Sequence, residues 1–229
     1  MNNEFGLINL WTEGDAVTRF VAILLLVMSL ASWVVIILKS LNFFSAQKQA
    51  GRIEAFWHSP NVAAGLQALG NEENNPFRAL AMRGQEALAH LNNSTSQPEL
   101  RQELDKSDWV TRSLQTTIDD ATAELQSGMA ILASVGSTSP FVGLFGTVWG
   151  IYHALMQIGM AGQATIDKVA GPIGEALIMT ALGLAVAIPA VLGYNALVRG
   201  NKAVIIRMNR FAHDLHALLV TGSRVKAKG

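Results

Sequence analysis

The residue with the clearest chemical potential in this sequence is Glu175, an ionisable side chain inside a long apolar stretch. Residues 126–198 contain only two other charged residues, Asp167 and Lys168, which are adjacent at an expected turn. A charged side chain at the centre of a membrane helix costs about 2.5–3.5 kcal/mol on insertion scales. Such residues typically serve ion passage, proton relay or a partner's counter-charge, and we predict a role of this kind for Glu175.

Two threonines are predicted to lie near the depth of Glu175. If the outer turn is centred near Gly162, Thr147 precedes it by about fifteen residues and Glu175 follows it by about thirteen, so both lie roughly 20 Å below the turn. Thr180 lies slightly deeper and about 140° around the helix from Glu175. We predict that Glu175, Thr147 and Thr180 line a proton path. Each threonine hydroxyl could instead bond a backbone carbonyl of its own helix, and Glu175 could be a protonated, hydrogen-bonded packing residue.

Small residues and prolines accompany these polar groups along both helices. Small residues let helices approach closely in lipid, and proline is tolerated in a membrane helix when neighbouring groups satisfy the carbonyl that it leaves unpaired. We assign to helix packing the residues Pro140, Gly143, Gly146, Gly150, Pro172, Gly183 and Pro189. Pro172 lies less than one turn before Glu175, so a local kink there would open space for the carboxyl group. His153 is a candidate relay residue, with a packed or interfacial histidine as the alternative.

The elements that must position these residues are three membrane-spanning helices. The chain has 229 residues and is 15% charged, whereas soluble domains average roughly 25%. Each apolar run is long enough to cross about 30 Å of hydrocarbon. The N-terminus is acidic and the first run lacks a cleavage motif, so we predict a retained helix rather than a signal peptide. The predicted spans are 19–39, 128–160 and 165–198.

The distribution of lysine and arginine predicts the orientation of these spans. None precedes Arg19, whereas the segment after the first span and the tail after the third span contain many. Lysine and arginine favour the cytoplasmic side of a membrane. We therefore predict an N-terminal segment 1–18 on the outer side, a cytoplasmic helical loop 40–127, a short outer turn 161–164, and a cytoplasmic helix and tail 199–229. The family resemblance described below implies that the membrane is the bacterial inner membrane and that the two outer segments are periplasmic.

The two cytoplasmic segments have the apolar periodicity of packed helices. Apolar residues recur at three- and four-residue spacing, namely Val110, Leu114, Ile118, Ala121 and Leu125, and then Val204, Met208, Phe211, Leu215 and Leu218. Pro98 suits a helix start and no proline follows it before Pro140, so we expect one long helix that runs into the second span. The predicted fold class is all-α, a polytopic membrane protein with three transmembrane helices, of which the second and third extend as long helices into the cytoplasm.

Several function classes are excluded by what the sequence lacks. It has no cysteine, so no disulfide, thiolate metal site or cysteine nucleophile is available. It also lacks a phosphate-binding P-loop, a zinc-protease motif and a serine-hydrolase elbow. We predict no enzyme activity, no cofactor, no metal and no nucleic-acid partner, and an energy source other than ATP bound to this chain.

Two segments resemble the ExbB/TolQ/MotA family of inner-membrane motor proteins. Residues 140–151, with the sequence PFVGLFGTVWGI, are similar to the family's second-span signature. Residues 174–184 and 187–190, followed by Tyr194 and Asn195, are similar to its third-span signature. Within the family, the sequences of residues 149–155 and 162–175 most resemble the ExbB branch. One departure is Gly171-Pro172, which commonly reads Pro-Gly in the family and which leaves Glu175 in register.

The resemblance implies a motor subunit. Members of the ExbB branch assemble as a ring, typically a pentamer, around membrane helices of an ExbD-type partner that carries an intramembrane aspartate. The complex is thought to use the proton gradient to drive TonB, which energises import of iron siderophores, haem or vitamin B12. By this resemblance Glu175, Thr147 and Thr180 match the polar lining of the pore, and the ring would contact membrane lipid. The alternatives are a TolQ-type motor for outer-membrane constriction and a passive membrane scaffold.

Overall fold

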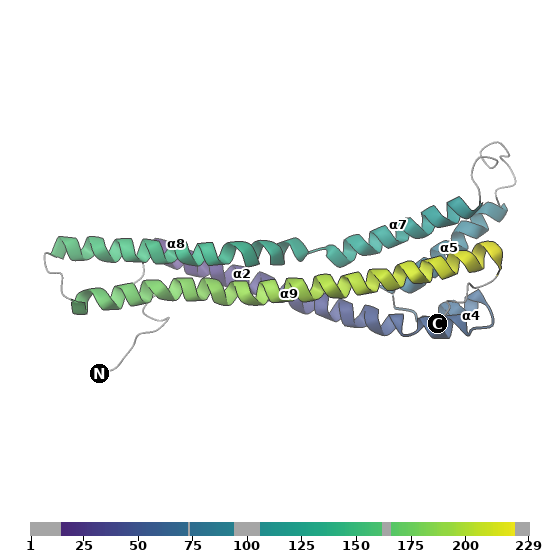
Figure 1. The fold of residues 1–229 in the computed structure, drawn as a ribbon, viewed down its shortest axis with the longest axis horizontal. Coiled ribbons are helices and arrows are strands. Elements are labelled where there is room, and N and C mark those ends of the chain that lie inside the picture. The colour runs from purple at the N-terminus through teal and green to yellow at the C-terminus, as the bar shows by residue number, and fades with distance from the viewer. Residues whose placement is uncertain (1–14, 73, 94–105, 162–165, 223–229) are drawn as a thin grey trace. The chain divides into compact units, whose positions relative to one another are not determined.

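The computed structural model describes residues 15–72, 74–93, 106–161 and 166–222, and all the regular structure in these ranges is helical (Figure 1). The helices in chain order are α2 (Ala16–Ala50), α3 (Ile53–Trp57), α4 (Val62–Ala68), α5 (Pro76–Asn93), α7 (Lys106–Gln126), α8 (Met129–Ala161) and α9 (Ile166–Thr221). Three helical stretches are long and apolar enough to cross a membrane. The all-α class with three membrane helices is therefore confirmed. Residues 1–14, the predicted helix start at Pro98 and most of the turn 161–164 lie outside the described ranges.

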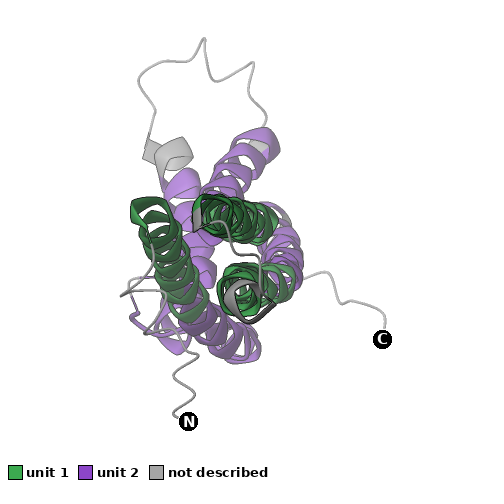
Figure 2. Cartoon of the chain, turned by 90° about the vertical axis from the view of Figure 1, so that its left-hand side faces the viewer, with its two compact units in different colours: residues 1–38, 128–196 green, residues 39–127, 197–229 purple. Residues whose placement is uncertain are grey.

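The chain divides into two compact units (Figure 2). Unit 1 comprises Met1–Leu38 and Gly128–Ala196 and contains the apolar portions of α2, α8 and α9, which run side by side (Figures 1 and 2). Its buried apolar cluster is small and centres on Val21, Leu25 and Met179. Many large apolar side chains of α2 are instead exposed. A soluble protein rarely exposes so large an apolar surface, whereas a membrane helix presents it to lipid.

Unit 2 comprises Lys39–Ser127 and Leu197–Gly229 and is a helical bundle with a conventional core. The core contains both apolar faces that were predicted from periodicity, with Val110, Leu114, Ile118, Val204, Met208, Phe211 and Leu215 all buried. Phe211 makes edge-on contacts with the rings of Phe56 and Phe77, at centroid distances of 5.3 and 6.0 Å. Edge-to-face aromatic pairs stabilise a core beyond the area they bury.

The prediction of one uninterrupted helix into the second span is wrong. Helix α7 ends at Gln126 and α8 begins at Met129, because Gly128 adopts a φ of 78° that ends a right-handed helix. Side chains bind two of the carbonyls at this break: Lys39 donates to the Glu124 oxygen at 2.7 Å and Asn201 to the Leu125 oxygen at 2.8 Å. The Glu124 oxygen also accepts the Ser127 amide at 3.2 Å. Helix α9 extends beyond its apolar stretch as predicted, and α2 does so as well.

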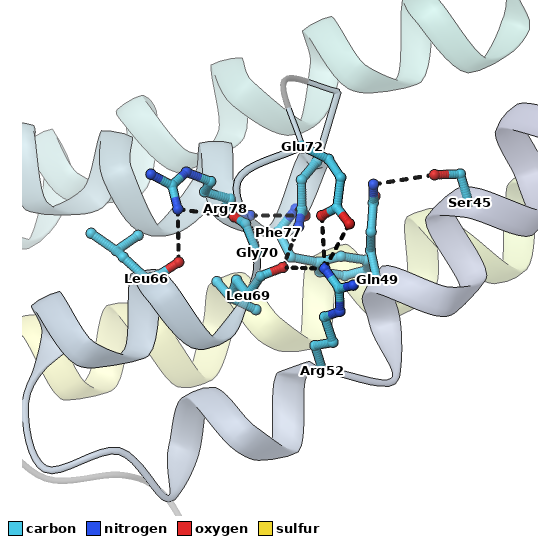
Figure 3. A network of polar contacts seen from close by, with 10 residues as sticks. Ser45, Gln49, Arg52, Leu66, Leu69, Gly70, Glu72, Phe77 and Arg78 are labelled. Atoms are coloured by element: carbon cyan, nitrogen blue, oxygen red, sulfur yellow. Dashed lines mark hydrogen bonds and ion pairs between the residues drawn. The ribbon is translucent and has the colours of Figure 1, made fainter.

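The connection between α4 and α5 is held by side chains that bind backbone carbonyls (Figure 3). Arg78 donates to the Leu66 and Gly70 oxygens at 2.8 and 2.9 Å. Arg52 donates to the Leu69 oxygen at 3.3 Å and to both carboxylate oxygens of Glu72 at 2.8 Å. The hydrogen bond from Arg52 lowers the pKa of the Glu72 carboxyl group below its ordinary value. The two arginines thus fix the turn that precedes α5.

Asn75 is predicted to be the most sensitive residue of this connection. Its Oδ1 accepts from the backbone amides of Phe77 and Arg78, both at 3.1 Å, and its Nδ2 donates to the Leu69 oxygen at 2.8 Å. The side chain is 2% exposed, so water cannot replace these bonds. Asn75→Ala is expected to destabilise unit 2 by about 2–3 kcal/mol, measured as a lower midpoint of thermal unfolding by circular dichroism.

A matched control for Asn75 is Asn61, which caps α4. Its Oδ1 accepts one backbone amide, that of Ala64, at 2.8 Å, and this bond is exposed to solvent. Asn61→Ala is expected to cost about 1 kcal/mol or less. Equal losses for the two alanine variants would show that burial and the bond to Leu69 add nothing to the Asn75 cap.

Candidate functional site

The two predicted threonines meet between α8 and α9 within one chain. Thr147 Oγ1 lies 2.6 Å from Thr180 Oγ1 and 2.9 Å from the backbone oxygen of Ala176. It also lies 3.2 Å from the oxygen of Gly143, one turn earlier in its own helix. Thr147 has a single hydroxyl proton, so donation to Ala176 leaves its oxygen to accept the proton of Thr180. The pair therefore joins the two helices, and the alternative of bonding only within the helix does not describe Thr147.

Glu175 directly precedes Ala176, whose backbone oxygen Thr147 contacts. Its side chain is partly exposed, whereas Thr147 is 6% exposed. The predicted similarity in depth of Glu175 and Thr147 agrees with this contact, because Thr147 reaches the residue that follows Glu175. Along α9, Thr180 follows Glu175 by five residues, which is about one and a half helical turns.

Close backbone approach between α8 and α9 makes this contact geometrically possible. A Cβ atom added at Gly143 would lie 2.5 Å from the Met179 oxygen and 3.0 Å from the Cα of Gly183. One added at Gly150 would lie 2.9 Å from the Cβ of Ala176. A Cβ atom added at Gly146 would lie 3.1 Å from side-chain atoms of both Val21 in α2 and Met179 in α9, which is tighter than ordinary van der Waals contact. The four glycines assigned to packing therefore lie at close helix contacts, where a side chain would separate the helices.

The remaining predicted residues do not join this contact. Pro140 lies inside α8 and Pro172 and Pro189 lie inside α9, and both helices continue through them. His153 is exposed on α8, away from the hydroxyl pair. Among the described residues no group of three histidine, cysteine, aspartate or glutamate side chains could hold a metal ion.

A hydrogen bond between side chains, which was not predicted from the sequence, joins the start of α2 to α8. Trp149 Nε1 donates to Asp15 Oδ2 at 2.6 Å, and the Thr18 amide donates to Asp15 Oδ1 at 2.8 Å, which caps α2. An aspartate directly before an apolar run is a signal for a helix cap. A buried indole N–H usually has an acceptor, but which residue supplies it depends on how α2 and α8 pack.

Unit 2 contains a second candidate site, a cavity of about 580 Å³. Among the described residues that line it, two are cationic, Lys39 and Arg83. Lys39 donates to the Glu124 oxygen, and Arg83 pairs with Glu86 at 3.2 Å. Because both cations already have partners, the cavity is a weak site for an anionic ligand, and the contact in unit 1 is the stronger functional candidate.

A model of the MotA/TolQ/ExbB proton channel family matches residues 72–210, which include α8, the hydroxyl pair and Glu175. This match covers more than half of the chain. The chain belongs to the MotA/TolQ/ExbB family.

Individual relatives within this family extend the match to nearly the whole chain. A biopolymer transport protein ExbB from Xanthomonas campestris pv. campestris is 43% identical, over 98% of this chain and 92% of the relative. An ExbB of the same description from Neisseria meningitidis is 40% identical, over 91% and 94%. A Tol-Pal system protein TolQ from Haemophilus influenzae is 34% identical, over 86% of each chain. These two ExbB relatives are thus more similar to this chain than the TolQ relative is.

Membership of the family explains the three apolar helices. The three apolar helices, the family match and the similarity to ExbB proteins together support a multi-pass inner-membrane protein of the ExbB biopolymer-transport type. The family description as a proton channel also directs attention to the polar groups of unit 1. The contact of Thr147 with Thr180 and Ala176 is a polar contact between α8 and α9, and Glu175 directly precedes Ala176.

Proposed function

We propose that this chain is the ring-forming subunit of an ExbB–ExbD-type proton-channel motor. The motor uses the proton motive force to energise TonB-dependent import of iron siderophores, haem or vitamin B12. The observation that carries the proposal is the contact of Thr147 with Ala176 and Thr180 beside Glu175, inside the segment that matches a proton channel family. The 40–43% identity to ExbB proteins supports the choice of branch.

The proposed assembly is a homo-oligomer, a pentamer by resemblance, that surrounds membrane helices of an ExbD-type partner. Its N-terminus is periplasmic and its C-terminus cytoplasmic, which the distribution of lysine and arginine supports. The partly exposed Glu175 faces the partner's intramembrane aspartate, while the hydroxyl pair holds α8 and α9 together behind it. Protonation of that aspartate lets the partner helices move inside the ring.

The energetics of this proposal are adequate. Moving one charge through 100 mV releases about 2.3 kcal/mol. A few protons per step therefore supply several kcal/mol, which exceeds the typical 1–3 kcal/mol of coupling between two sites. No ATP bound to this chain is required.

The test is complementation in cells that lack their own ExbB-type subunit. The chain is co-expressed with its ExbD-type partner, and TonB-dependent iron uptake is measured with and without a protonophore. We expect uptake that the protonophore abolishes, together with a ring that contains the partner by native mass spectrometry. A chain that assembles but supports no uptake contradicts the proposal.

The second candidate, a TolQ-type motor, is tested in the same experiment. The chain is also expressed in cells that lack TolQ, and outer-membrane integrity is measured as resistance to detergent. The lower identity to TolQ relatives, 31–34%, predicts weak rescue there. Full rescue of the TolQ defect without rescue of iron uptake would assign the chain to envelope constriction.

A further inference from the structure

Asp15 uses both carboxylate oxygens to join two helices of unit 1. Oδ1 accepts the Thr18 amide at 2.8 Å at the start of α2, and Oδ2 accepts the indole N–H of Trp149 from α8 at 2.6 Å. Hydrogen bonds to an ionised acceptor are shorter and stronger than neutral ones. Asp15 thus couples the first residues of α2 to a defined position on α8.

The Asp15 carboxyl group is ionised under physiological conditions. Burial raises its pKa, but the hydrogen bonds from Thr18 and Trp149 outweigh burial, and His153 adds to them, so the pKa lies below its ordinary value of 3.8. A group whose pKa is lowered by folding stabilises the folded state above its unfolded pKa. The hydrogen bond from Trp149 to ionised Asp15 therefore persists at neutral pH, and it weakens only as the pH falls through the lowered pKa of Asp15 in the folded state.

Trp149 and Thr147 lie on different faces of α8. Two residues correspond to about 200° of helix rotation, so Trp149 reaches α2 while Thr147 reaches α9. The indole ring is also held along α8 by Phe145 and Tyr152, whose centroids lie 6.5 and 6.1 Å away. A rotation of α8 that moved Thr147 away from Thr180 would also pull Trp149 from Asp15.

The packing between α8 and α9 is close at the glycines of α8. A Cβ atom added at Gly143 would lie 2.5 Å from the Met179 oxygen and one added at Gly150 would lie 2.9 Å from the Cβ of Ala176, so this face of α8 is the one turned to α9. Small residues permit close approach but provide little register. The hydrogen bond from Trp149 to Asp15 adds a directional contact on another face of α8, so both contacts depend on the same rotation of the helix.

We propose that Asp15 is a positioning residue which, through Trp149, sets the rotation of α8 so that Thr147 faces Ala176 and Thr180. This inference rests on the proposed function of that contact, and it predicts that loss of the hydrogen bond from Trp149 to Asp15 impairs coupling without dissolving the assembly. Capping α2 is the simpler role of Asp15, and the variants below separate the two roles.

The test measures how Thr147 and Thr180 face one another by disulfide formation. The chain has no cysteine, so Thr147→Cys with Thr180→Cys gives a single reporter pair in the complete complex in membranes. Trp149→Phe keeps an aromatic ring and removes the donor, and Asp15→Asn keeps a good helix cap and removes the charge. Each of these two substitutions is expected to slow disulfide formation about tenfold, which corresponds to the loss of one charge-assisted hydrogen bond. The double variant is expected to react no more slowly than the slower single variant, because both substitutions remove the same bond.

Tyr152→Phe is the matched control, because it retains the ring beside Trp149 and removes only a hydroxyl group. It is expected to leave the disulfide rate unchanged. If Asp15→Ala slows the reaction while Asp15→Asn and Trp149→Phe do not, Asp15 only caps α2 and the proposal is overturned. Unchanged rates in every variant overturn it as well.

A second readout keeps this inference separate from the proposed function. With both threonines intact, Trp149→Phe is expected to reduce protonophore-sensitive iron uptake several-fold while native mass spectrometry shows an unchanged assembly. If the native chain itself supports no uptake, the proposed function fails, and the disulfide rates still test the positioning role. A Trp149→Phe complex with full uptake and a slowed disulfide reaction would show that the rotation of α8 does not limit coupling, and would overturn the functional half of the inference.

Discussion

Glu175→Gln is expected to reduce gradient-driven uptake to the background of cells that lack the subunit, while the ring and its partner still assemble. Glutamine has nearly the volume of glutamate and can hydrogen-bond, but it neither ionises nor takes up a proton at physiological pH. An ionisable group retained in an apolar helix despite its insertion cost is expected to serve through its charge. Uptake of an iron siderophore, normalised to the amount of complex in membranes, is the measurement.

Gly174→Ala is a matched control for Glu175→Gln. Gly174 precedes Glu175 in α9, and a Cβ atom there would meet no other atom within 4 Å in the chain. This variant is expected to retain uptake, which shows that a change beside Glu175 is tolerated. Full uptake by a normally assembled Glu175→Gln complex would eliminate a titrating role. Loss of assembly in that variant would instead make Glu175 a packing residue, as the alternative interpretation holds.

Gly143→Leu is expected to produce the largest structural defect of any single change in unit 1. Even the first atom of a side chain would lie 2.5 Å from the Met179 backbone oxygen, which cannot move without shifting α9. Overpacking of a tight contact costs typically 1–3 kcal/mol and sometimes more. Separation of the helices would also break the contact between Thr147 and the Ala176 oxygen. We expect a lower midpoint of thermal unfolding in detergent and loss of uptake.

Gly143→Ala and Gly159→Ala form a matched pair around this prediction. Both glycines lie within α8, but Gly159 has no atom within 4 Å of the position that a Cβ would take. Gly159→Ala is expected to be neutral or to stabilise by up to about 1 kcal/mol, because alanine favours the helix. Gly143→Ala should destabilise despite that gain. Equal midpoints for the two variants would show that α9 adjusts freely to a side chain at Gly143.

Most of the fold was predictable because it depends on local patterns. The apolar runs are as long as a bilayer is thick, which is sufficient to identify three membrane helices. The three- and four-residue spacing around Leu114 and Met208 identified faces that the structure buries in unit 2. The exception is the break at Gly128, where one glycine with positive φ interrupts a pattern that otherwise reads as a continuous helix. A glycine alone is a weak signal, because many glycines lie inside α8 and α9.

The candidate site was predictable as a set of residues and not as a set of contacts. Glu175 stands out by charge in an apolar segment, and helix rise alone placed Thr147 near its depth. The functional roles of Glu175, Thr147 and Thr180 stay predictions. The partners of Thr147 required the structure, since a threonine hydroxyl can bond its own helix or a neighbouring one at similar cost. The packing of α8 against α9 decides in favour of Ala176 and Thr180.

The sequence by itself determined the all-α class, the three apolar helices and the residue types available for chemistry, because hydrophobicity, helix periodicity and charge are properties of short segments. Only the tertiary structure decided which groups meet: Thr147 with Thr180, Gly143 with Gly183, and Asp15 with Trp149 across 134 residues of chain. Such pairings depend on the rotation and register of each helix against its neighbours. Several rotations satisfy the same apolar pattern, and the close packing of specific side chains selects one of them.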